Sequence, residues 1–209
     1  MGRYSPLSIL VFFVMEYFYS EVVSQGFSDY NTLTTNLFMN YEKRTRPSTA
    51  GSATAVYMIF EPSSIMSLDE SEQVLYTYAT LKCQWDDDTL SWDPSNYSGI
   101  TNFLWPQDDV WLPDLVITNS VKDARRLGFK EMPVRVESSG AVAWFPSMIL
   151  ATSCDMDITY YPFDTQKCNI ILSTTMSTYE EISILPKGEP ISWAEYSSRQ
   201  PARSNSNPV

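Results

Sequence analysis

The segment CDMDITYYPFDTQKC, residues 154–168, says more about the architecture of this 209-residue chain than any other segment. The cysteines at its two ends enclose 13 residues, and in the chain-entropy model a disulfide around a loop of that size stabilises a protein by roughly 3 kcal/mol. The aromatic tip would then be a stiff apolar knob, with Tyr161–Pro162 a candidate cis peptide. We expect Asp157 and Asp164 to hold the loop in shape by accepting backbone N–H groups.

This interpretation depends on the compartment in which the chain folds, and the N-terminus points to secretion. Arg3 supplies a positive charge, Leu7–Met15 is a short apolar run, and small residues follow it, which is typical of a cleaved signal peptide. We therefore expect a signal peptide over residues 1–24 and a secreted or extracellular product; the alternative is a buried N-terminal helix. Other apolar runs fall short of the roughly 18 residues of a membrane helix, so we expect no membrane span in this chain.

In an oxidising compartment the cysteine pattern favours a disulfide between Cys154 and Cys168 over two free thiols. Cys83 is left over and lies at an apolar alternation position, so we favour a buried, inert thiol over an intermolecular bridge. Asn96 begins the only Asn-x-Ser/Thr sequon of the sequence, Asn96-Tyr97-Ser98, and we expect it to carry a glycan.

Composition excludes most catalytic and cofactor chemistry. With 14 Lys and Arg against 25 Asp and Glu, the formal net charge is −11, so no nucleic-acid partner is expected. The chain has no histidine and three cysteines, which rules out Ser-His-Asp catalysis, histidine-ligated metals and four-cysteine metal sites. Its seven glycines lie too far apart for a nucleotide-binding loop. We therefore expect no enzyme activity, no metal site and no cofactor.

Two acidic runs, Asp86–Asp88 and Asp108–Asp109, need separate treatment. Neighbouring carboxylates bind Ca²⁺ in some proteins, and they also create a negative potential that attracts cations. The glycine and glutamate spacing of a calcium-binding loop is missing, however. We favour solvated turns in which Asp87 is hydrogen-bonded locally.

Residue patterning predicts an all-β domain preceded by one helix. Apolar residues recur at helical spacing from Tyr30 to Tyr41, Ser28 or Asp29 can cap the start, and Pro47 bars continuation. Later segments alternate in polarity or are rich in β-branched and aromatic residues, which is typical of strands, and residues 137–140 are typical of a hairpin turn. The expected strands are Thr54–Phe60, Val74–Trp85, Val134–Val136, Ala141–Phe145 and Cys168–Leu172. We predict an antiparallel β-sandwich with an N-terminal α-helix.

Three motifs follow one another along the chain. They are Trp85-x-Asp87-x-x-Leu90-x-Trp92, then Trp111-x-Pro113-Asp114 followed by Asn119, then Cys154 to Cys168 with Pro162-Phe163-Asp164 between them. Together they resemble the extracellular domain of Cys-loop receptors, the pentameric neurotransmitter-gated ion channels. Within that family the resemblance is greatest to the nicotinic acetylcholine receptor branch and the acetylcholine-binding proteins. We interpret the three tryptophans of the first two motifs as core residues.

The resemblance implies a ligand-binding domain over residues 28–198. The last strand pair of the family, with its adjacent cysteines and ligand-capping tyrosines, has no counterpart here, because residues 199–209 are a polar segment that we expect to be a disordered tail. We therefore expect a C-terminally truncated domain with incomplete last strands. The partners implied are homologous subunits in a ring, usually a pentamer, and a small-molecule ligand.

The resemblance also implies a role for the tip of residues 154–168, called the Cys loop from here on. In the family this loop faces the membrane domain and couples ligand binding to the gate. Tyr161, Pro162, Phe163 and Asp164 would then be coupling residues. The alternative is a staple across an edge of the sandwich.

Carried over position by position, the ligand cage of the family is degenerate in this chain. Nicotinic pockets lie between subunits and hold a quaternary ammonium against aromatic rings by cation–π attraction. The aromatic positions of the family fall at Thr80, Thr118 and Thr175, which offer no π face. Tight acetylcholine binding is therefore not expected. The tyrosines that could rebuild part of the cage are Tyr76, Tyr78 and Tyr179.

Two functions follow from these observations. The favoured one is the extracellular ligand-binding domain of a nicotinic acetylcholine-like channel subunit, or a soluble acetylcholine-binding relative. The alternative is an agonist-incompetent assembly or decoy subunit, which joins related subunits without binding ligand itself.

Overall fold

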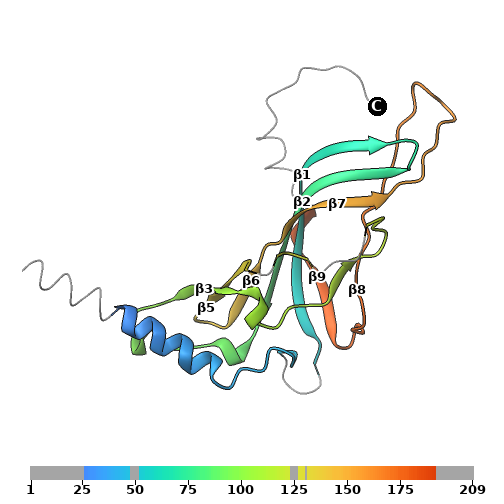
Figure 1. The fold of residues 1–209 in the computed structure, drawn as a ribbon. Helices are drawn as coiled ribbons and strands as arrows, with labels where there is room; N and C mark the ends of the chain where they lie inside the picture. Colours follow the sequence, from blue (N-terminus) through green and yellow to red (C-terminus); the bar gives the residue numbers. More distant parts are fainter. Residues whose placement is uncertain (1–25, 48–51, 123–126, 130, 192–209) are drawn as a thin grey trace, which may run out of the picture.

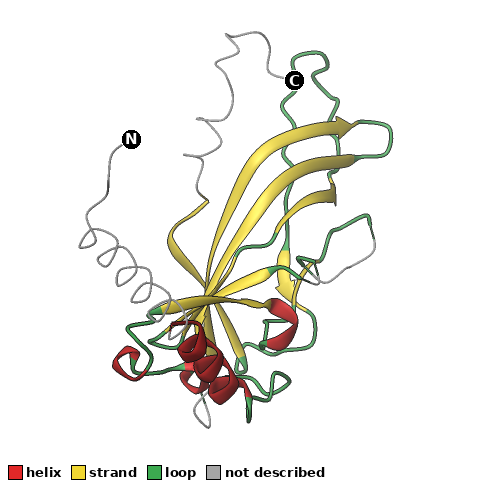
Figure 2. Cartoon of the chain, turned by 60° about the vertical axis from the view of Figure 1, so that its left-hand side comes forward, coloured by secondary structure: helices red, strands yellow, loops and turns green. Residues whose placement is uncertain are grey.

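The structure, a computed structural model, describes residues 26–47, 52–122, 127–129 and 131–191. The predicted signal peptide and the predicted tail lie outside these residues. Within them the chain forms one α-helix, over residues 26–38, and then a succession of strands and short 3₁₀ turns (Figure 2). The predicted all-β class with a leading helix is confirmed.

A long antiparallel hairpin runs through the whole domain. β1 (Thr54–Asp69) pairs with β2 (Val74–Asp86), and the two strands curve from the helix end of the molecule toward the Cys loop (Figure 1). Residues 77, 79, 81, 83 and 85 of β2 are buried, whereas the residues between them are partly or fully exposed. Because side chains alternate between the faces of a strand, this pattern confirms the strand predicted at Val74–Trp85 from its alternation.

Hydrogen bonding extends the hairpin into a seven-stranded sheet with the order β3-β5-β6-β2-β1-β9, in which β7 also pairs with β2. The added strands are β3 (Asn102–Pro106), β5 (Pro133–Glu137), β6 (Ala141–Trp144), β7 (Ser147–Ser153) and β9 (Ile182–Ile191). The pairing of β1 with β9 is parallel, and the other pairings of this sheet are antiparallel. β9 can run parallel to β1 because a long crossover through the rest of the chain separates them.

A smaller sheet of β4 (Leu115–Ile117) and β8 (Leu172–Thr174) forms the second layer. Ala79 of β2, Ile117 of β4 and Leu150 of β7 meet in one buried cluster. Apolar contacts of this kind hold the layers of a sandwich face to face. The two-layer arrangement predicted from the sequence is therefore present.

The strand predicted at Cys168–Leu172 is wrong in its bounds, because β8 begins only at Leu172. The side chain of Asn119 engages the backbone before it. Its Nδ2 donates to the carbonyl of Asn169 at 2.7 Å, and its Oδ1 accepts the N–H of Ile171 at 3.0 Å. Such side-chain bonds replace the ladder bonds that a strand would make.

Aromatic side chains fill the core between the helix and the large sheet. Phe38 at the end of the helix stacks on Trp105 of β3, with ring centroids 4.6 Å apart. Deeper in the core, Trp85 and Trp111 meet edge to face at 5.7 Å, and they are only 1% and 8% exposed. Trp92 packs against the same cluster. The interpretation of these tryptophans as core residues is confirmed.

The predicted helix caps are wrong. Both Ser28 and Asp29 lie inside the helix over residues 26–38 rather than at its start. The Asp29 carboxylate accepts a hydrogen bond from the hydroxyl of Ser98 instead. The helix ends well before Pro47, so the proline does not determine its last residue.

The hairpin predicted at residues 137–140 connects β5 to β6. Gly140 has a φ of +88°, and a Cβ at this position would lie 2.7 Å from the carbonyl oxygen of Asp87. Only glycine combines a positive φ with so close an approach of backbone. The N–H of Asp87 donates to the carbonyl of Gly140 at 2.8 Å. This contact locks the hairpin against η1 (Asp88–Leu90), the 3₁₀ turn that follows β2.

Candidate functional site

The base of the Cys loop is tied to the end of the long hairpin. Cys154 and Cys168 form a disulfide with an S–S distance of 1.93 Å, and their Cα atoms lie 4.9 Å apart. Cys154 is buried, and its N–H donates to the carbonyl of Gln73 at 2.8 Å. Because Gln73 lies in the turn between β1 and β2, this hydrogen bond ties the loop to the turn, whereas the disulfide closes the base of the loop.

The third cysteine takes no part in this site. Cys83 on β2 is a free, buried thiol. Burial raises its pKa to about 12, because the interior disfavours the charged thiolate. The thiol therefore stays protonated and inert at neutral pH, as predicted.

Polar side chains frame the inside of the Cys loop. Asp157 accepts hydrogen bonds from the hydroxyl and the N–H of Thr159, at 2.5 and 3.0 Å, and these bonds lower its pKa. Gln166 spans the loop: its Oε1 accepts the N–H of Asp157 at 3.0 Å, and its Nε2 donates to the Asp157 carbonyl at 2.9 Å. Asp164 accepts the amide of Gln166, so the expectation that it accepts a backbone N–H is wrong.

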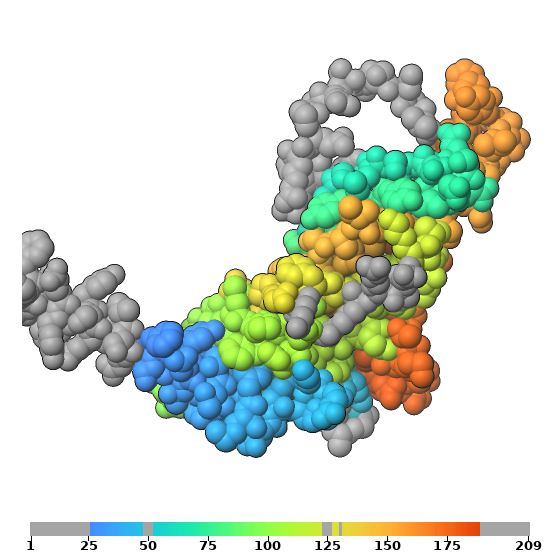
Figure 3. All heavy atoms as spheres, viewed as in Figure 1, coloured from blue at the N-terminus to red at the C-terminus, as the bar shows by residue number. Residues whose placement is uncertain are grey.

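The Cys loop projects beyond the rest of the described chain (Figure 3, orange). Tyr160, Tyr161 and Phe163 are 75%, 72% and 90% exposed, and the Tyr161–Pro162 peptide is cis as expected. A staple across a sandwich edge would bury its apolar residues against the chain itself. These side chains are instead exposed, and exposed apolar patches commonly mark interaction sites.

Thr80, the first of the three predicted cage positions, lies on the outer face of the large sheet. It pairs with Glu61 of β1 and Ser147 of β7, and its hydroxyl lies 2.7 Å from the Ser147 hydroxyl. Because side chains alternate along β2, Thr80 points away from its neighbour Ala79, which is buried between the two sheets.

Exposed apolar residues accompany Thr80 on this outer face. Tyr78 of β2 and Ile149 of β7 lie directly opposite each other and are 37% and 55% exposed. This pair places an aromatic and an aliphatic side chain on the solvent-facing side of the large sheet, close to Thr80.

Thr118 and Thr175, the other two cage positions, belong to the small sheet. Thr118 follows β4, and both its N–H and its hydroxyl donate to the carbonyl of Ile171, at 2.8 and 3.2 Å. Thr175 follows β8 and donates its N–H to the carbonyl of Asp114 at 3.0 Å. Both threonines are exposed, at opposite ends of the β4–β8 pair.

Asp114 positions the backbone around Thr175. Its Oδ2 accepts the N–H groups of Thr175, Met176 and Ser177 at 3.1, 2.8 and 3.1 Å. Burial opposes ionisation of this carboxyl, but the hydrogen bonds from Met176 and Ser177 outweigh it and lower the pKa. Asp114 and Thr175 also line a cavity of about 630 Å³, which is within the size range of small-molecule sites.

The three cage positions do not come together within one chain. Thr80 lies on the outer face of the large sheet, whereas Thr118 and Thr175 are exposed on the small sheet. Ala79 and Ile117, the direct neighbours of Thr80 and Thr118, belong to one buried cluster that lies between the two sheets. A site that uses all three positions needs two copies of this domain or two related domains.

The tyrosines near these positions are divided in the same way. Tyr78 belongs to the outer face of the large sheet, and Tyr179 follows β8 on the other side and is 82% exposed. Tyr76 already has a cation over its ring, because the Lys122 Nζ lies 5.2 Å from the ring centroid. Tyr78 and Tyr179 are thus the aromatic residues available at the two sides.

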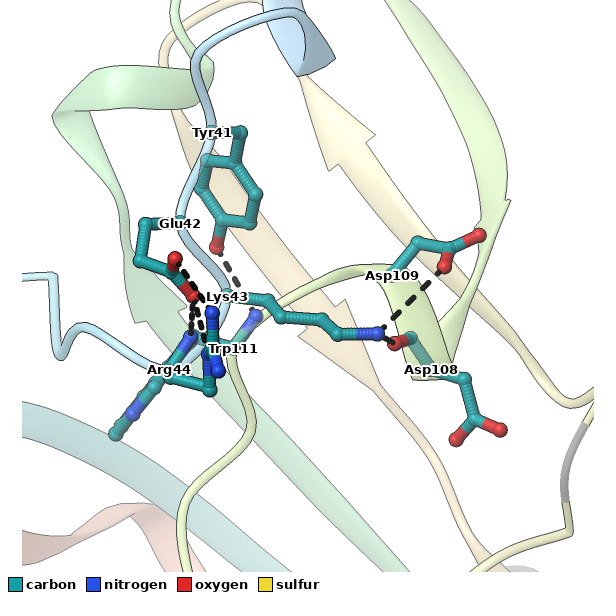
Figure 4. A network of polar contacts seen from close by, with 7 residues as sticks. All are labelled: Tyr41, Glu42, Lys43, Arg44, Asp108, Asp109 and Trp111. Atoms are coloured by element: carbon teal, nitrogen blue, oxygen red, sulfur yellow. Dashed lines mark hydrogen bonds and ion pairs between the residues drawn. The ribbon is translucent and has the colours of Figure 1, made fainter.

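A partly buried hydrogen-bond relay fixes the segment that leads into β4. The Tyr41 hydroxyl accepts the N–H of Trp111 at 3.0 Å (Figure 4). It donates to the Asp87 carboxylate at 2.8 Å. Burial raises the pKa of Tyr41 above its ordinary value, and the nearby charge of Asp87 adds to the effect. Tyr41 thereby joins the segment after the helix to two of the sequence motifs.

A second link beside the relay is more exposed. The Lys43 Nζ donates to the carbonyl of Asp108 at 2.6 Å and lies 3.9 Å from the carboxylate of Asp109 (Figure 4). Arg44 forms a bidentate pair with Glu42 and lowers its pKa to about 2. Exposed pairs of this kind contribute little to stability, so they orient this segment rather than hold it.

The acidic runs have structural roles. Asp87 accepts the N–H of Thr89 at 3.1 Å and caps η1, which confirms the predicted local hydrogen bonding. It is buried rather than solvated, however, because Tyr41 covers it. In the part of the chain that the structure describes, no three His, Cys, Asp or Glu side chains are grouped so as to hold a metal ion. Nor does any described helix combine the length and apolarity needed to cross a membrane.

Sequence reasoning missed three positioning residues. Tyr41 was assigned only to the apolar face of the helix, although a tyrosine in a buried stripe usually finds a hydrogen-bond partner, which is a signal that could have found it. Asp114 and Asn119 belong to a quoted motif, but nothing local in the sequence indicates that they bond to residues some 50 to 60 positions later.

Comparison with known proteins identifies a family and several relatives that this chain matches. The sequence model of the family described as "Neurotransmitter-gated ion-channel ligand binding domain" matches residues 30–205. The human neuronal acetylcholine receptor subunit beta-3 is 36% identical over 141 residues, which are 67% of this chain and 31% of that protein.

Two further relatives come from other animals. Acetylcholine receptor subunit alpha-1-A of Xenopus laevis is 33% identical over 167 residues, 79% of this chain and 35% of that protein. Acetylcholine receptor subunit beta-type acr-2 of Caenorhabditis elegans is 33% identical over 158 residues, which are 75% of this chain and 27% of that protein. The chain thus spans about a third of the length of these relatives. It belongs to the neurotransmitter-gated ion-channel ligand-binding domain family.

Proposed function

We propose that this chain is the extracellular ligand-binding domain of an acetylcholine receptor-like subunit, either within a channel subunit or as a soluble relative. The three relatives named above support this, because all are acetylcholine receptor subunits. The same matches favour this function over that of an agonist-incompetent decoy. Since the relatives are receptors, we propose no catalytic residue and no cofactor.

The observation that carries the proposal is the position of the three threonines on two different faces. A ligand held by all three must lie between neighbouring domains, with Thr118 and Thr175 contributed by one domain and Thr80 by the next. Repeating this contact closes a ring of homologous subunits, and heterologous contacts close into rings when the rotation permits. We propose a pentamer at the extracellular face of the membrane.

The ligand we propose is a small organic cation bound with low affinity. A net charge of −11 draws cations toward the domain. Threonine provides no π face, however, and each missing aromatic wall removes roughly 0.5 to 2 kcal/mol of cation binding. Tyr78 and Tyr179 are exposed on the two sides and can each supply an aromatic ring.

The Cys loop is the surface we assign to coupling. Tyr161, Pro162, Phe163 and Asp164 form a tip whose aromatic residues are exposed, whereas its base is bonded to the β1–β2 turn. A shift of the long hairpin would therefore move the tip. This arrangement supports contact with a membrane-embedded partner domain.

Assembly is tested by multi-angle light scattering on protein secreted from animal cells, alone and co-expressed with a related subunit. We expect a particle of about five chain masses, and Tyr78→Glu on the outer face should dissociate it. Phe163→Glu at the tip of the Cys loop is the matched control, because it adds the same charge outside the proposed contact, and it should leave the ring intact. A monomer under both conditions contradicts the proposal.

Ligand binding is tested by restoring the aromatic walls. The variant with Thr80→Trp, Thr118→Tyr and Thr175→Trp should bind acetylcholine more tightly than the unmodified chain in calorimetric titration. Roughly 0.5 to 2 kcal/mol per wall corresponds to a gain of about 2- to 30-fold for each. Thr32→Trp on the exposed face of the helix is the control and should change nothing. No gain in the assembled triple variant contradicts the proposed site.

A further inference from the structure

Asn96 lies on a small, well-formed surface turn at the helix end of the molecule. It is the last residue of η2 (Pro94–Asn96), which Asp93 caps by accepting the N–H of Ser95 at 2.9 Å. The backbone N–H of Asn96 donates to the Asp93 carbonyl at 3.1 Å. The side chain of Asn96 is exposed, and its amide makes no hydrogen bond to any described residue.

The other two residues of the sequon face the N-terminal helix instead. The Tyr97 hydroxyl accepts the side-chain amide of Asn36 at 3.3 Å, and the Ser98 hydroxyl donates to Asp29. Ser98 has a φ of +50°, which turns the chain back toward the helix. The turn is thus held from one side, and Asn96 is left on the solvent side.

Positions along strand β2 show how far this turn lies from the proposed functional surfaces. The turn follows the Asp86 end of β2, whereas Thr80 lies six residues back along the strand and Val74 lies twelve back, beside the Cys loop. At about 3.3 Å per residue these separations are roughly 20 and 40 Å along the strand. Figure 1 shows the helix and the Cys loop at opposite ends of the molecule.

We propose that Asn96 carries an N-linked glycan that projects from the helix end, outside both subunit-contact faces and far from the Cys loop. The inference requires the extracellular placement proposed above. In the transfer, the Asn96 amide nitrogen bonds to the anomeric carbon of a lipid diphosphate-linked oligosaccharide. The carbon–oxygen bond to the diphosphate breaks, the lipid diphosphate leaves, and the amide loses one proton.

The test is intact-mass spectrometry of the full chain secreted from animal cells, before and after treatment with an N-glycan amidase. We expect one glycan, removed by the enzyme with conversion of Asn96 to Asp, and absent from Asn96→Gln. Asn40→Gln is the matched control, because Asn40-Tyr41-Glu42 is equally exposed and also has tyrosine second, but lacks the sequon hydroxyl. It should keep the glycan.

Further variants separate the effect of the sequon from the effect of the hydrogen bond between Ser98 and Asp29. Asp29→Ala removes the partner of Ser98 without touching the sequon and should keep the glycan, whereas Ser98→Ala should lose it and Ser98→Thr should retain it. Glu42→Thr creates a second sequon at Asn40. This variant reports whether the chain is accessible to the enzyme that transfers the oligosaccharide. A glycan on Asn40 in that variant with none on Asn96 overturns the proposal, and so does a chain that carries no glycan at either position. Neither result bears on ring assembly, which light scattering measures separately.

Discussion

The two ends of the long β1–β2 hairpin use aromatic residues in opposite ways. At the helix end, Trp85 and Trp111 are buried edge to face, and Phe38 stacks on Trp105. At the other end, the aromatic residues of the Cys loop are exposed, and a disulfide with polar hydrogen bonds gives the loop its shape. The difference teaches that one end is stabilised by apolar burial, whereas the other is stabilised by a disulfide and polar hydrogen bonds while its aromatic residues remain exposed.

The largest expected loss of stability comes from a substitution at the buried, helix end of the hairpin. Trp85→Ala should lower the free energy of unfolding by about 3–5 kcal/mol, because it removes a large, fully buried side chain and leaves a cavity. Phe163→Ala is the control at the exposed end and should change the free energy by less than about 0.5 kcal/mol. Urea unfolding followed by fluorescence measures both. Similar losses in the two variants would contradict the division between the ends.

The next effect concerns the covalent end. The double variant with Cys154→Ala and Cys168→Ala should lose about 3 kcal/mol, because the unfolded chain regains the entropy of an open loop. Cys83→Ala should lose only about 1 kcal/mol, since it removes one buried sulfur and no cross-link. Thermal melts under identical conditions compare the two. Equal losses would show that the disulfide is not what holds the loop.

Tyr41→Phe tests how much the hydrogen bonds of the Tyr41 hydroxyl add to apolar burial at the helix end. It leaves the N–H of Trp111 and one carboxylate oxygen of buried Asp87 without a partner, which should cost about 1–3 kcal/mol. The folded-state pKa of Tyr41 is raised, so its contribution to stability is complete below the unfolded value of about 10 and is lost as the pH rises above it.

Urea midpoints between pH 8 and 11 test the sign. In a Cys83→Ala background, which removes a buried thiol whose pKa is also raised, the parent should lose stability above about pH 10 and the Tyr41→Phe variant should lose less. Parallel curves would show that Tyr41 is not the titrating group.

Asp114→Asn should have a smaller effect on stability than the three preceding test variants, about 1 kcal/mol, because the partly exposed carboxylate loses charge-assisted bonds but its amide oxygen still accepts. The folded-state pKa of Asp114 is lowered, so its contribution is complete above about pH 4 and is lost as the pH falls below that value. The variant should therefore be less sensitive to acid. Amide exchange at Met176 and Ser177 reports the same bonds directly, and unchanged exchange would contradict the assignment.

Much of the fold could be predicted from residues close in sequence. The alternation along β2, the Gly140 hairpin and the cysteine spacing are local patterns, and each is present as expected. The start of β8 and the helix cap could not be predicted, because Asn119 and Ser98 engage these segments from 50 and 69 positions away. Local propensity does not record such long-range hydrogen bonds.

The candidate site was predictable only in part for a related reason. The sequence identifies Thr80, Thr118 and Thr175 as positions, but it does not show on which faces they lie. The buried cluster that contains Ala79 and Ile117 reveals that the first threonine and the second point to different sides of the domain. The exposure of the Cys loop tip likewise depends on how the sheets pack.

The two-domain site is tested most directly by dividing the three aromatic substitutions between two chains. One chain carries Thr80→Trp and the other carries Thr118→Tyr with Thr175→Trp, and acetylcholine binding is titrated for each chain alone and for the co-expressed pair. Neither chain alone contains all three walls at one interface, so we expect the tighter binding only in the co-expressed assembly. Equal affinity in all three samples, or full gain in a single monomeric chain that carries all three substitutions, would contradict a site shared between subunits.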